Sequence, residues 1–260
     1  MRTHRWYPIA ILVVLIGAAC SPDENRATGT AQSPTGSASD VSAAGSISED
    51  DGYTVDIDPA DFVDRVDNPY FTLEPGTIFR LRGETEDGIE RETVTVTDRT
   101  RTVMGVQTTV VKDVMRTNGE ISELTHDWYA QDREGNLWYF GEATAEYENG
   151  KVLNHHGAWE AGVDGALPGI ILNANPQVTD SYRQEFYTGE AEDMFWVVAT
   201  GETKSVPLGR FEDTVKVMEW TPLEPKIVVT KTYAPGVGLL SERALSGGKE
   251  NVQLIEVRHP

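Results

Sequence analysis

Carboxylates are the side chains in this sequence that could most directly do chemistry. Glu190, Glu192 and Asp193 form the densest acidic run in the second half of the chain, and Asp127 and Glu142 could join them as pairs. Paired carboxylates cleave glycosidic bonds or help to hold calcium. Four tryptophans could stack on sugar rings: Trp128, Trp138, Trp159 and Trp196. A solvated acidic turn beside core aromatics explains the same residues, and the composition favours that plainer interpretation.

The histidines give a weaker indication of a metal site. His126, His155 and His156 lie in the part of the chain that we expect to fold. Zinc needs three or four converging ligands, and adjacent residues of a strand point to opposite faces, so His155 and His156 are not expected to serve together. No cofactor is evident from the sequence, although a calcium or zinc ion remains compatible with it.

Covalent catalysis has no support in the sequence. The single cysteine, Cys20, follows an N-terminal apolar run, and no serine of the expected folded part stands in a Gly-x-Ser-x-Gly motif. The glycine-rich stretch 162–169 lacks the Gly-Lys-Ser/Thr ending of a phosphate loop, and the acidic turn near Gly135 lacks EF-hand spacing.

A candidate ligand site can still be placed in the range 143–180, which interrupts the strand pattern. Its glycine-rich part would let backbone approach a ligand closely, although the same glycines could simply let the chain cross between two sheets. Eight residues of this range and of the turn after it are the candidates: His155, His156, Trp159, Glu160, Asp164, Glu190, Glu192 and Asp193.

The elements that must position these residues are expected to be β-strands. Alternation with period two and β-branched residues predict strands over 78–82, 92–97, 106–115, 120–129, 137–140, 182–187, 195–199, 214–220, 227–233, 238–243 and 252–257. A polar break at Gly135 and Asn136 between two aromatic runs predicts a hairpin over 126–142. Pro59 could start a short helix that runs to about Val66. The expected fold class is all-β, an antiparallel sheet arranged as a half-barrel or a sandwich.

Several residue pairs recur in order at a spacing of 103 or 104 residues. These are Phe79-Arg80 with Tyr182-Arg183, Val103 with Val206, Gly105 with Gly209, Lys112 with Lys216, and Tyr129-Ala130 with Tyr233-Ala234. The series predicts an internal duplication. We therefore expect a first repeat at 53–142, a connector at 143–180 and a second repeat at 181–260, all in one globular domain, with a ligand site where the repeats meet.

The N-terminal region predicts export and lipid anchoring. Residues 1–19 have a basic start and an apolar run, as a signal peptide does, and the following Gly17-Ala18-Ala19-Cys20 resembles a bacterial lipobox, with Gly17 where leucine is usual. The resemblance implies a lipid on Cys20 and a protein held at the outer side of a membrane. Residues 20–52, rich in Ser, Gly, Ala and acidic side chains, are expected to be a flexible tether.

The charge of the chain restricts its partners. Its formal net charge of −20 becomes −22 when residues 1–19, with two arginines and no acidic residue, are removed. Such a surface repels nucleic acid and anionic lipid headgroups, while a basic ligand, a neutral ligand or a metal ion stays compatible.

Several phrases of the sequence resemble a family of exported bacterial proteins, many of them lipoproteins, with no established activity. They are DNPYF with LEPGT, DWYAQDREGNLWYFGE, WEAGVDGALPGI, YRQEFYTGEAEDM and TYAPGVGLLSE, and together they span most of the range 67–256. The resemblance implies no catalytic residues. The interpretation favoured by the sequence is a lipoprotein whose β domain binds a small molecule, glycan or protein; the alternative is an extracytoplasmic enzyme that acts on a glycan through carboxylates.

Overall fold

The computed structural model describes residues 52–260, and Val55–Pro260 belong to one compact unit. The expected signal peptide, Cys20 and nearly all of the expected tether lie outside the described residues. The described region has no helix with the length and apolar character that crossing a membrane requires.

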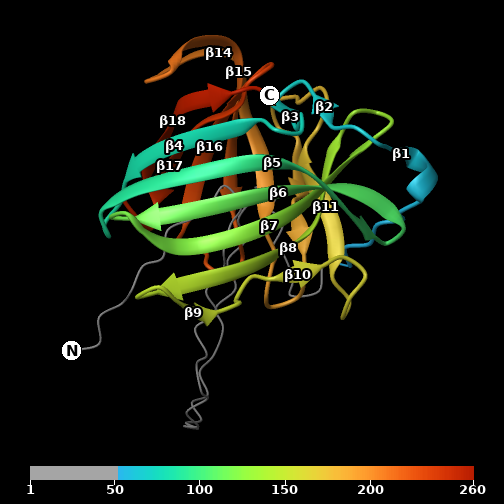
Figure 1. The fold of residues 1–260 in the computed structure, drawn as a ribbon. Coiled ribbons are helices and arrows are strands. Elements are labelled where there is room, and N and C mark those ends of the chain that lie inside the picture. The colour runs from blue at the N-terminus through green and yellow to red at the C-terminus, as the bar shows by residue number, and fades with distance from the viewer. Residues whose placement is uncertain (1–51) are drawn as a thin grey trace, which may run out of the picture. The chain divides into compact units, whose positions relative to one another are not determined.

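Sixteen of the strands within residues 52–260 join in one antiparallel sheet, and most of them lie on a single hydrogen-bonded path. Figure 1 shows part of this path, β4 to β8, as strands lying one beside the next. In order along the path the strands are β12 (Ser181–Arg183), β14 (Met194–Val206), β15 (Gly209–Trp220), β16 (Val228–Ala234), β17 (Gly238–Ser246), β18 (Asn251–Arg258), β4 (Ile78–Glu84), β5 (Ile89–Val103), β6 (Val106–Thr117), β7 (Glu120–Asp132), β8 (Leu137–Glu148), β11 (Leu167–Leu172) and β13 (Glu185–Phe186). Three short strands add to this path: β1 (Phe62–Val63) beside β7, and β9 (Lys151–Asn154) and β10 (Trp159–Glu160) beside β8.

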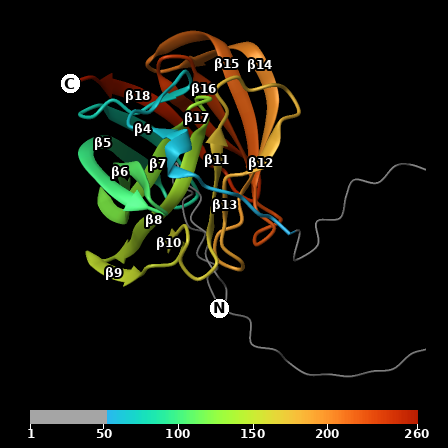
Figure 2. The same cartoon turned by 90° about the vertical axis from the view of Figure 1, so that its right-hand side faces the viewer.

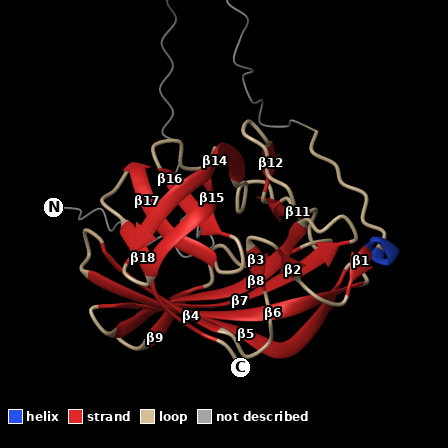
Figure 3. Cartoon of the chain, turned by 90° about the horizontal axis from the view of Figure 1, so that it is seen from above, coloured by secondary structure: helices blue, strands red, loops and turns tan. Residues whose placement is uncertain are grey.

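The sheet returns on itself and nearly closes as a barrel. The two ends of the path, β12 and β13, are separated in the chain only by Gln184. Figure 2 shows β11, β12 and β13 near one another at this closure, and Figure 3 shows β14 to β18 on one side with β4 to β7 on the other. Gly169 in β11 permits the approach, because a Cβ there would stand 2.4 Å from the carbonyl oxygen of Arg183. The closure therefore needs a residue without a side chain at this position.

The all-β antiparallel fold predicted from the sequence is confirmed. Of the two arrangements expected, a half-barrel or a sandwich, the continuous sheet of residues 52–260 agrees with the barrel-like one. The hairpin over 126–142 is also confirmed, since β7 and β8 pair across the turn that contains Gly135, with φ of +87°. The helix expected from Pro59 to Val66 is wrong beyond its first turn. A 3-10 helix spans Pro59–Asp61, and the chain then pairs with the edge of β7 as β1.

The range 143–180 contains more regular structure than its glycine content indicates. It begins inside β8, which continues to Glu148, and it holds β9, β10 and β11. β11 pairs with β8 on one side and with β13 on the other. This segment is therefore part of the barrel wall.

The strand order agrees with the predicted duplication. The series β4 to β8 is a five-stranded meander. The series β12, β14, β15, β16 and β17 pairs in the same order, although β13, which pairs with β11, lies between β12 and β14 in the chain. Gly105 and Gly209 lie in the second hairpin of each series. Tyr129 in β7 and Tyr233 in β16 are both buried at 2% exposure. The registers differ, because Thr109 lies opposite Tyr129 whereas Val215 lies opposite Tyr233. The duplication remains a prediction that a superposition of the two series would test.

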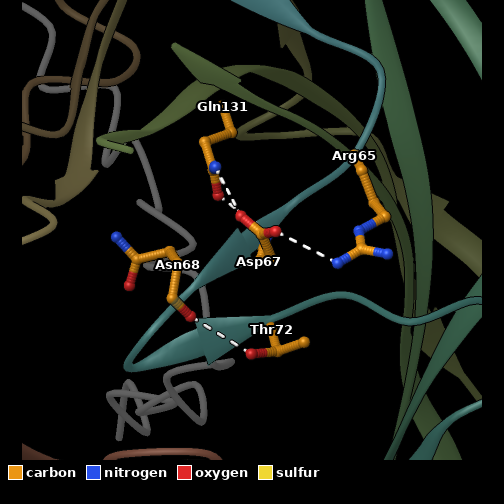
Figure 4. Close-up of polar contacts among 5 residues, drawn as sticks. All are labelled: Arg65, Asp67, Asn68, Thr72 and Gln131. Atoms are coloured by element: carbon orange, nitrogen blue, oxygen red, sulfur yellow. Dashed lines mark hydrogen bonds and ion pairs between the residues drawn. The ribbon is translucent and has the colours of Figure 1, made fainter. Parts of the chain in front are cut away.

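A small hairpin, β2 (Asp67–Asn68) with β3 (Phe71–Thr72), caps one end of the barrel. Gln131 at the end of β7 donates to the Asp67 carboxylate at 2.8 Å and accepts from the Asp67 backbone N–H at 2.8 Å, as Figure 4 shows together with Arg65 and Thr72. The Asn68 amide, also drawn there, donates to the carbonyl oxygens of Gly135 and Leu172. The DNPYF segment therefore contains the residues whose hydrogen bonds hold the cap on the β7–β8 hairpin.

The barrel interior has two zones along its length. Beneath the cap, Phe71 packs against Tyr129 and Tyr233, with ring centroids 5.5 and 6.1 Å away. Leu81 and Val94 belong to the same apolar cluster. Further from the cap the inward positions of the same strands become polar and charged.

Candidate functional site

The zone away from the cap is lined by acidic side chains. In β5, Glu90 and Glu92 are in phase with Val94 and Val96, so the face that forms the apolar core under the cap continues as an acidic face. Across residues 52–260, twelve carboxylates are buried: Glu90, Glu92, Asp113, Glu123, Asp127, Glu142, Glu146, Glu185, Asp193, Glu219, Glu242 and Glu250. Only two basic residues in that range, Arg183 and Lys231, are equally buried. The interior is therefore strongly acidic.

Strand register places some of these carboxylates directly opposite one another. Asp127 in β7 lies opposite Glu142 in β8, and Glu123 lies opposite Glu146 on the same two strands. Opposite residues of an antiparallel pair have Cβ atoms about 5 Å apart, and like charges at that position destabilise the sheet. The arrangement requires either protons or a cation between the carboxylates.

Hydrogen bonds satisfy this acidic zone only in part. The Tyr139 hydroxyl donates to Asp127 Oδ1 at 3.2 Å, and Thr125 donates to Glu123 Oε1 at 3.1 Å. Within the described part of the chain, Oδ1 of Asp113 and Oε2 of Glu142 are buried without a hydrogen-bond partner. An unsatisfied buried acceptor costs about 1 to 3 kcal/mol, and more when it is charged.

The other side of the interior contains a cation supplied by the chain itself. Lys231 Nζ lies 2.6 Å from Glu219 Oε2 and 3.7 Å from Glu242 Oε2. Gln184 donates to the other Glu219 oxygen at 3.1 Å. Burial alone would lower the pKa of Lys231, but Glu219 and Glu242 outweigh that effect and raise the pKa well above its usual value. Lys231 is therefore held as a buried ammonium ion.

The pKa values of several interior carboxyls are raised, among them those of Asp127, Glu142, Glu185 and Glu242. Burial is the largest cause for Asp127 and Glu142, and the negative charge of a neighbour adds to it: Asp113 for Asp127, and Asp127 for Glu142. Burial also raises the pKa of Glu185 to about 8 and that of Glu242 to about 8, in spite of the opposing effect of Lys231. Glu185 and Glu242 therefore hold protons near neutral pH unless a cation replaces them.

A separate apolar cavity lies under the cap. Its volume is about 30 Å³, and its lining includes Phe71, Leu73, Phe79, Leu81 and Leu239. A space of that size holds a water molecule or two, and drug-sized ligands need roughly ten times more. We regard it as a packing defect of the core.

The structure divides the eight candidate residues instead of gathering them in one cleft. Trp159 and Asp193 are buried, and the Trp159 indole N–H donates to Glu185 Oε2 at 2.8 Å. The other six are at least partly exposed: His155, His156, Glu160, Asp164, Glu190 and Glu192. Glu160 pairs with Arg101, and Glu192 accepts from the backbone N–H of Gly189. No set of three or more His, Cys, Asp and Glu within the described ranges could hold a metal ion.

Sequence analysis identified Asp127, Glu142 and Asp193 as candidates for paired carboxylates but missed most of the acidic interior. The pattern that would have revealed it is a charged residue two positions away from a core residue of the same strand. Asp113 follows Val111 by two positions, and Lys231 precedes Tyr233 by two. Because strand alternation places both members of such a pair on one face, these charges could have been assigned to the barrel interior.

Among solved structures, two are similar to this chain. No protein-family model matches the chain, and no curated protein matches it. A Bacteroides fragilis protein assigned as exported, with a YmcC-like fold, aligns with a TM-score of 0.43 and 17% identity over 73% of this chain and 99% of its own. A Parabacteroides distasonis protein assigned as a lipoprotein aligns with a TM-score of 0.40 and 14% identity over 74% of this chain and 100% of its own. At these values the likeness bears on no question of function.

Proposed function

We propose that this protein is an extracytoplasmic lipoprotein, anchored through Cys20, whose barrel interior binds a positively charged organic ligand. The location follows from the signal-like residues 1–19 and the lipobox-like sequence before Cys20. Membership of the exported bacterial family that the sequence phrases resemble is part of the same proposal.

The observation that carries the binding proposal is the excess of buried acid over buried base among residues 52–260, twelve side chains against two. Moving an uncompensated carboxylate out of water costs several kcal/mol even after the protein relaxes. In the free protein, bound protons offset that cost by neutralising the carboxylates. A bound cation of suitable shape would also offset it, and would add its electrostatic attraction to the ionised carboxylates. A neutral or anionic ligand would leave the cost in place.

The alternative, a glycan-cleaving enzyme, has less support from the geometry. Of the carboxylates proposed for it in the connector and the following turn, Asp164 and Glu190 are exposed and Glu160 pairs with Arg101, while only Asp193 is buried. A sugar chain is too bulky to lie between the opposed Asp127 and Glu142, which are exposed by only 4% and 2%, whereas a single ammonium group is no larger than the Lys231 ammonium that the interior already encloses.

A matched pair of probes tests the proposal. We expect 1,4-diaminobutane to bind the full-length chain in calorimetry at pH 7.5 and to raise its melting temperature, whereas uncharged 1,4-butanediol should do neither. The measurement is repeated at high salt, because binding to the acidic surface alone would be screened. Equal responses to the diamine and the diol, or a diamine response that disappears in salt, would contradict the proposal.

A further inference from the structure

The predicted duplication pairs β7 with β16, and the two strands carry opposite charges at one corresponding position. Two residues before the buried tyrosine, β7 has Asp127 and β16 has Lys231. Each lies directly opposite a glutamate of the next strand, Asp127 opposite Glu142 and Lys231 opposite Glu242. One half thus pairs an ammonium with a carboxylate, and the other pairs two carboxylates.

From this asymmetry we infer that a primary ammonium or guanidinium group of the ligand binds between Asp127 and Glu142, where it plays the part that the Lys231 ammonium plays in the other half. The inference rests on the proposed function and specifies its site and ligand class. Asp113 completes the site from β6, since it lies two residue pairs along the ladder from Val111, the residue opposite Asp127, and therefore on the same face of the sheet.

The hydrogen-bonding state of the site determines which cations fit. Oδ1 of Asp113 and Oε2 of Glu142 have no donor within residues 52–260, and both residues are at least nine-tenths buried, with exposures of 5% and 2%. Such oxygens need N–H donors as well as positive charge. A quaternary ammonium carries the charge but has no N–H, so it would leave them unsatisfied. The site therefore selects primary amines or guanidines.

The aromatic residues beside the carboxylates supply too few hydrogen-bond donors to satisfy them. Tyr139 stacks on Tyr129 with ring centroids 5.1 Å apart, and Trp159 meets Tyr139 edge-on at 5.3 Å. The Tyr139 hydroxyl already donates to Asp127 and has one proton to give, so it cannot satisfy the whole group.

The inference is tested on the full-length chain with two probes and four proteins. The probes are 1,4-diaminobutane and its permethylated analogue 1,4-bis(trimethylammonio)butane, which has equal charge and no N–H. The proteins are the wild type, Asp127→Asn, Asp127→Lys and the control Glu134→Gln, which removes an exposed carboxylate from the same hairpin. Titration calorimetry gives the apparent Kd, and thermal unfolding shows whether each variant is folded.

We expect the diamine to bind the wild type at least about tenfold more tightly than the permethylated analogue, the difference expected from hydrogen bonds to charged groups. Asp127→Asn should weaken diamine binding by a similar factor, and Asp127→Lys should abolish it, because the new ammonium would occupy the site. Glu134→Gln should bind as the wild type does.

Other outcomes separate this inference from the proposed function. If both dications bind equally, or if the diamine binds Asp127→Lys as well as the wild type, the interior binds cations but the assigned site and ligand class are wrong. If neither probe binds the wild type, the inference and the proposed function fail together. The comparison of the two probes on the wild type decides the matter even if both Asp127 variants fail to fold.

Discussion

Glu185→Gln should stabilise this protein at neutral pH, although it replaces a buried, hydrogen-bonded residue. Glu185 lies at the barrel closure in β13, and the Trp159 indole donates to it. Burial is the main cause that raises its pKa to about 8; Glu219 raises it further, while Trp159 and Lys231 oppose the rise. A glutamine amide keeps an oxygen that accepts from Trp159 and has no charge to desolvate.

The sign and size of the effect follow from proton linkage. Between pH 4.5, the ordinary pKa of a glutamate, and about 8, the folded protein keeps a proton that the unfolded chain has released. Its free energy of unfolding therefore falls as pH rises through this window, by about 1.4 kcal/mol per pH unit for one such group. Below pH 4.5 both states are protonated and the stability is fully present. The variant, which cannot titrate at this position, should match the wild type near pH 4.5 and exceed it by several kcal/mol, on the order of 5, by pH 8.

Urea denaturation at pH 4.5, 6, 7 and 8, followed by tryptophan fluorescence, measures this difference. The exposed Glu134→Gln substitution is the control and should follow the wild type at every pH. The wild-type slope should exceed that of one group, since the pKa of Glu242 is also raised to about 8. A Glu185→Gln variant that parallels the wild type at all pH values, or that is less stable at pH 8, would refute the argument that this carboxyl is desolvated.

Three further substitutions test the closure, the internal ammonium and the anchor. Gly169→Ala should lower the free energy of unfolding by about 2 kcal/mol or more through overpacking. The control Gly248→Ala, whose added methyl meets nothing within 4 Å, should leave the melting temperature nearly unchanged. Equal effects of the two substitutions would contradict the closure argument. Lys231→Met should cost about 3 to 5 kcal/mol in urea denaturation at pH 7.5, because it leaves the buried Glu219 carboxylate without its ammonium partner; a loss below about 1 kcal/mol would contradict this argument. Cys20→Ser should move the protein from the membrane fraction to the soluble fraction on centrifugation, and a variant that stays with the membrane would rule out lipid at this residue.

The strands were predictable from sequence because one face of each is buried and the other is solvated. The predicted lengths were too short where this contrast disappears. β5 was expected to end at Thr97 but continues to Val103 through five consecutive exposed residues, the last three of which, Thr100 to Thr102, pair with β6 near the tip of the hairpin. Hydrogen bonding alone extends the strand there, and alternation of apolar and polar residues cannot reveal it.

The candidate site was predictable only where its residues lie close in the chain. Asp127 and Glu142 belong to one hairpin, and their pairing follows from its turn. Glu185 and Lys231 reach the same interior only because the sheet closes at Gln184, and no local pattern specifies that closure. The glycines at 162 and 165 indicated a binding loop, but both have positive φ, of 83° and 88°, and serve a turn at the surface.

The acidic interior has an energetic consequence for how the fold should be understood. The apolar zone beneath the cap, with its stacked and tilted aromatic rings, supplies a core of the kind that holds small β-barrels together. The carboxylates beyond it contribute nothing comparable, since each is buried at a cost that protons only partly offset. A fold that needed only stability would be improved by amides or apolar residues at these positions. Because sites built for binding commonly reduce stability, an interior that lowers the stability of its own barrel is better explained by an incoming cation than by the needs of folding. The Glu185→Gln measurement therefore bears on function as well as stability: a stabilised variant would show that the native carboxylate is retained at a cost.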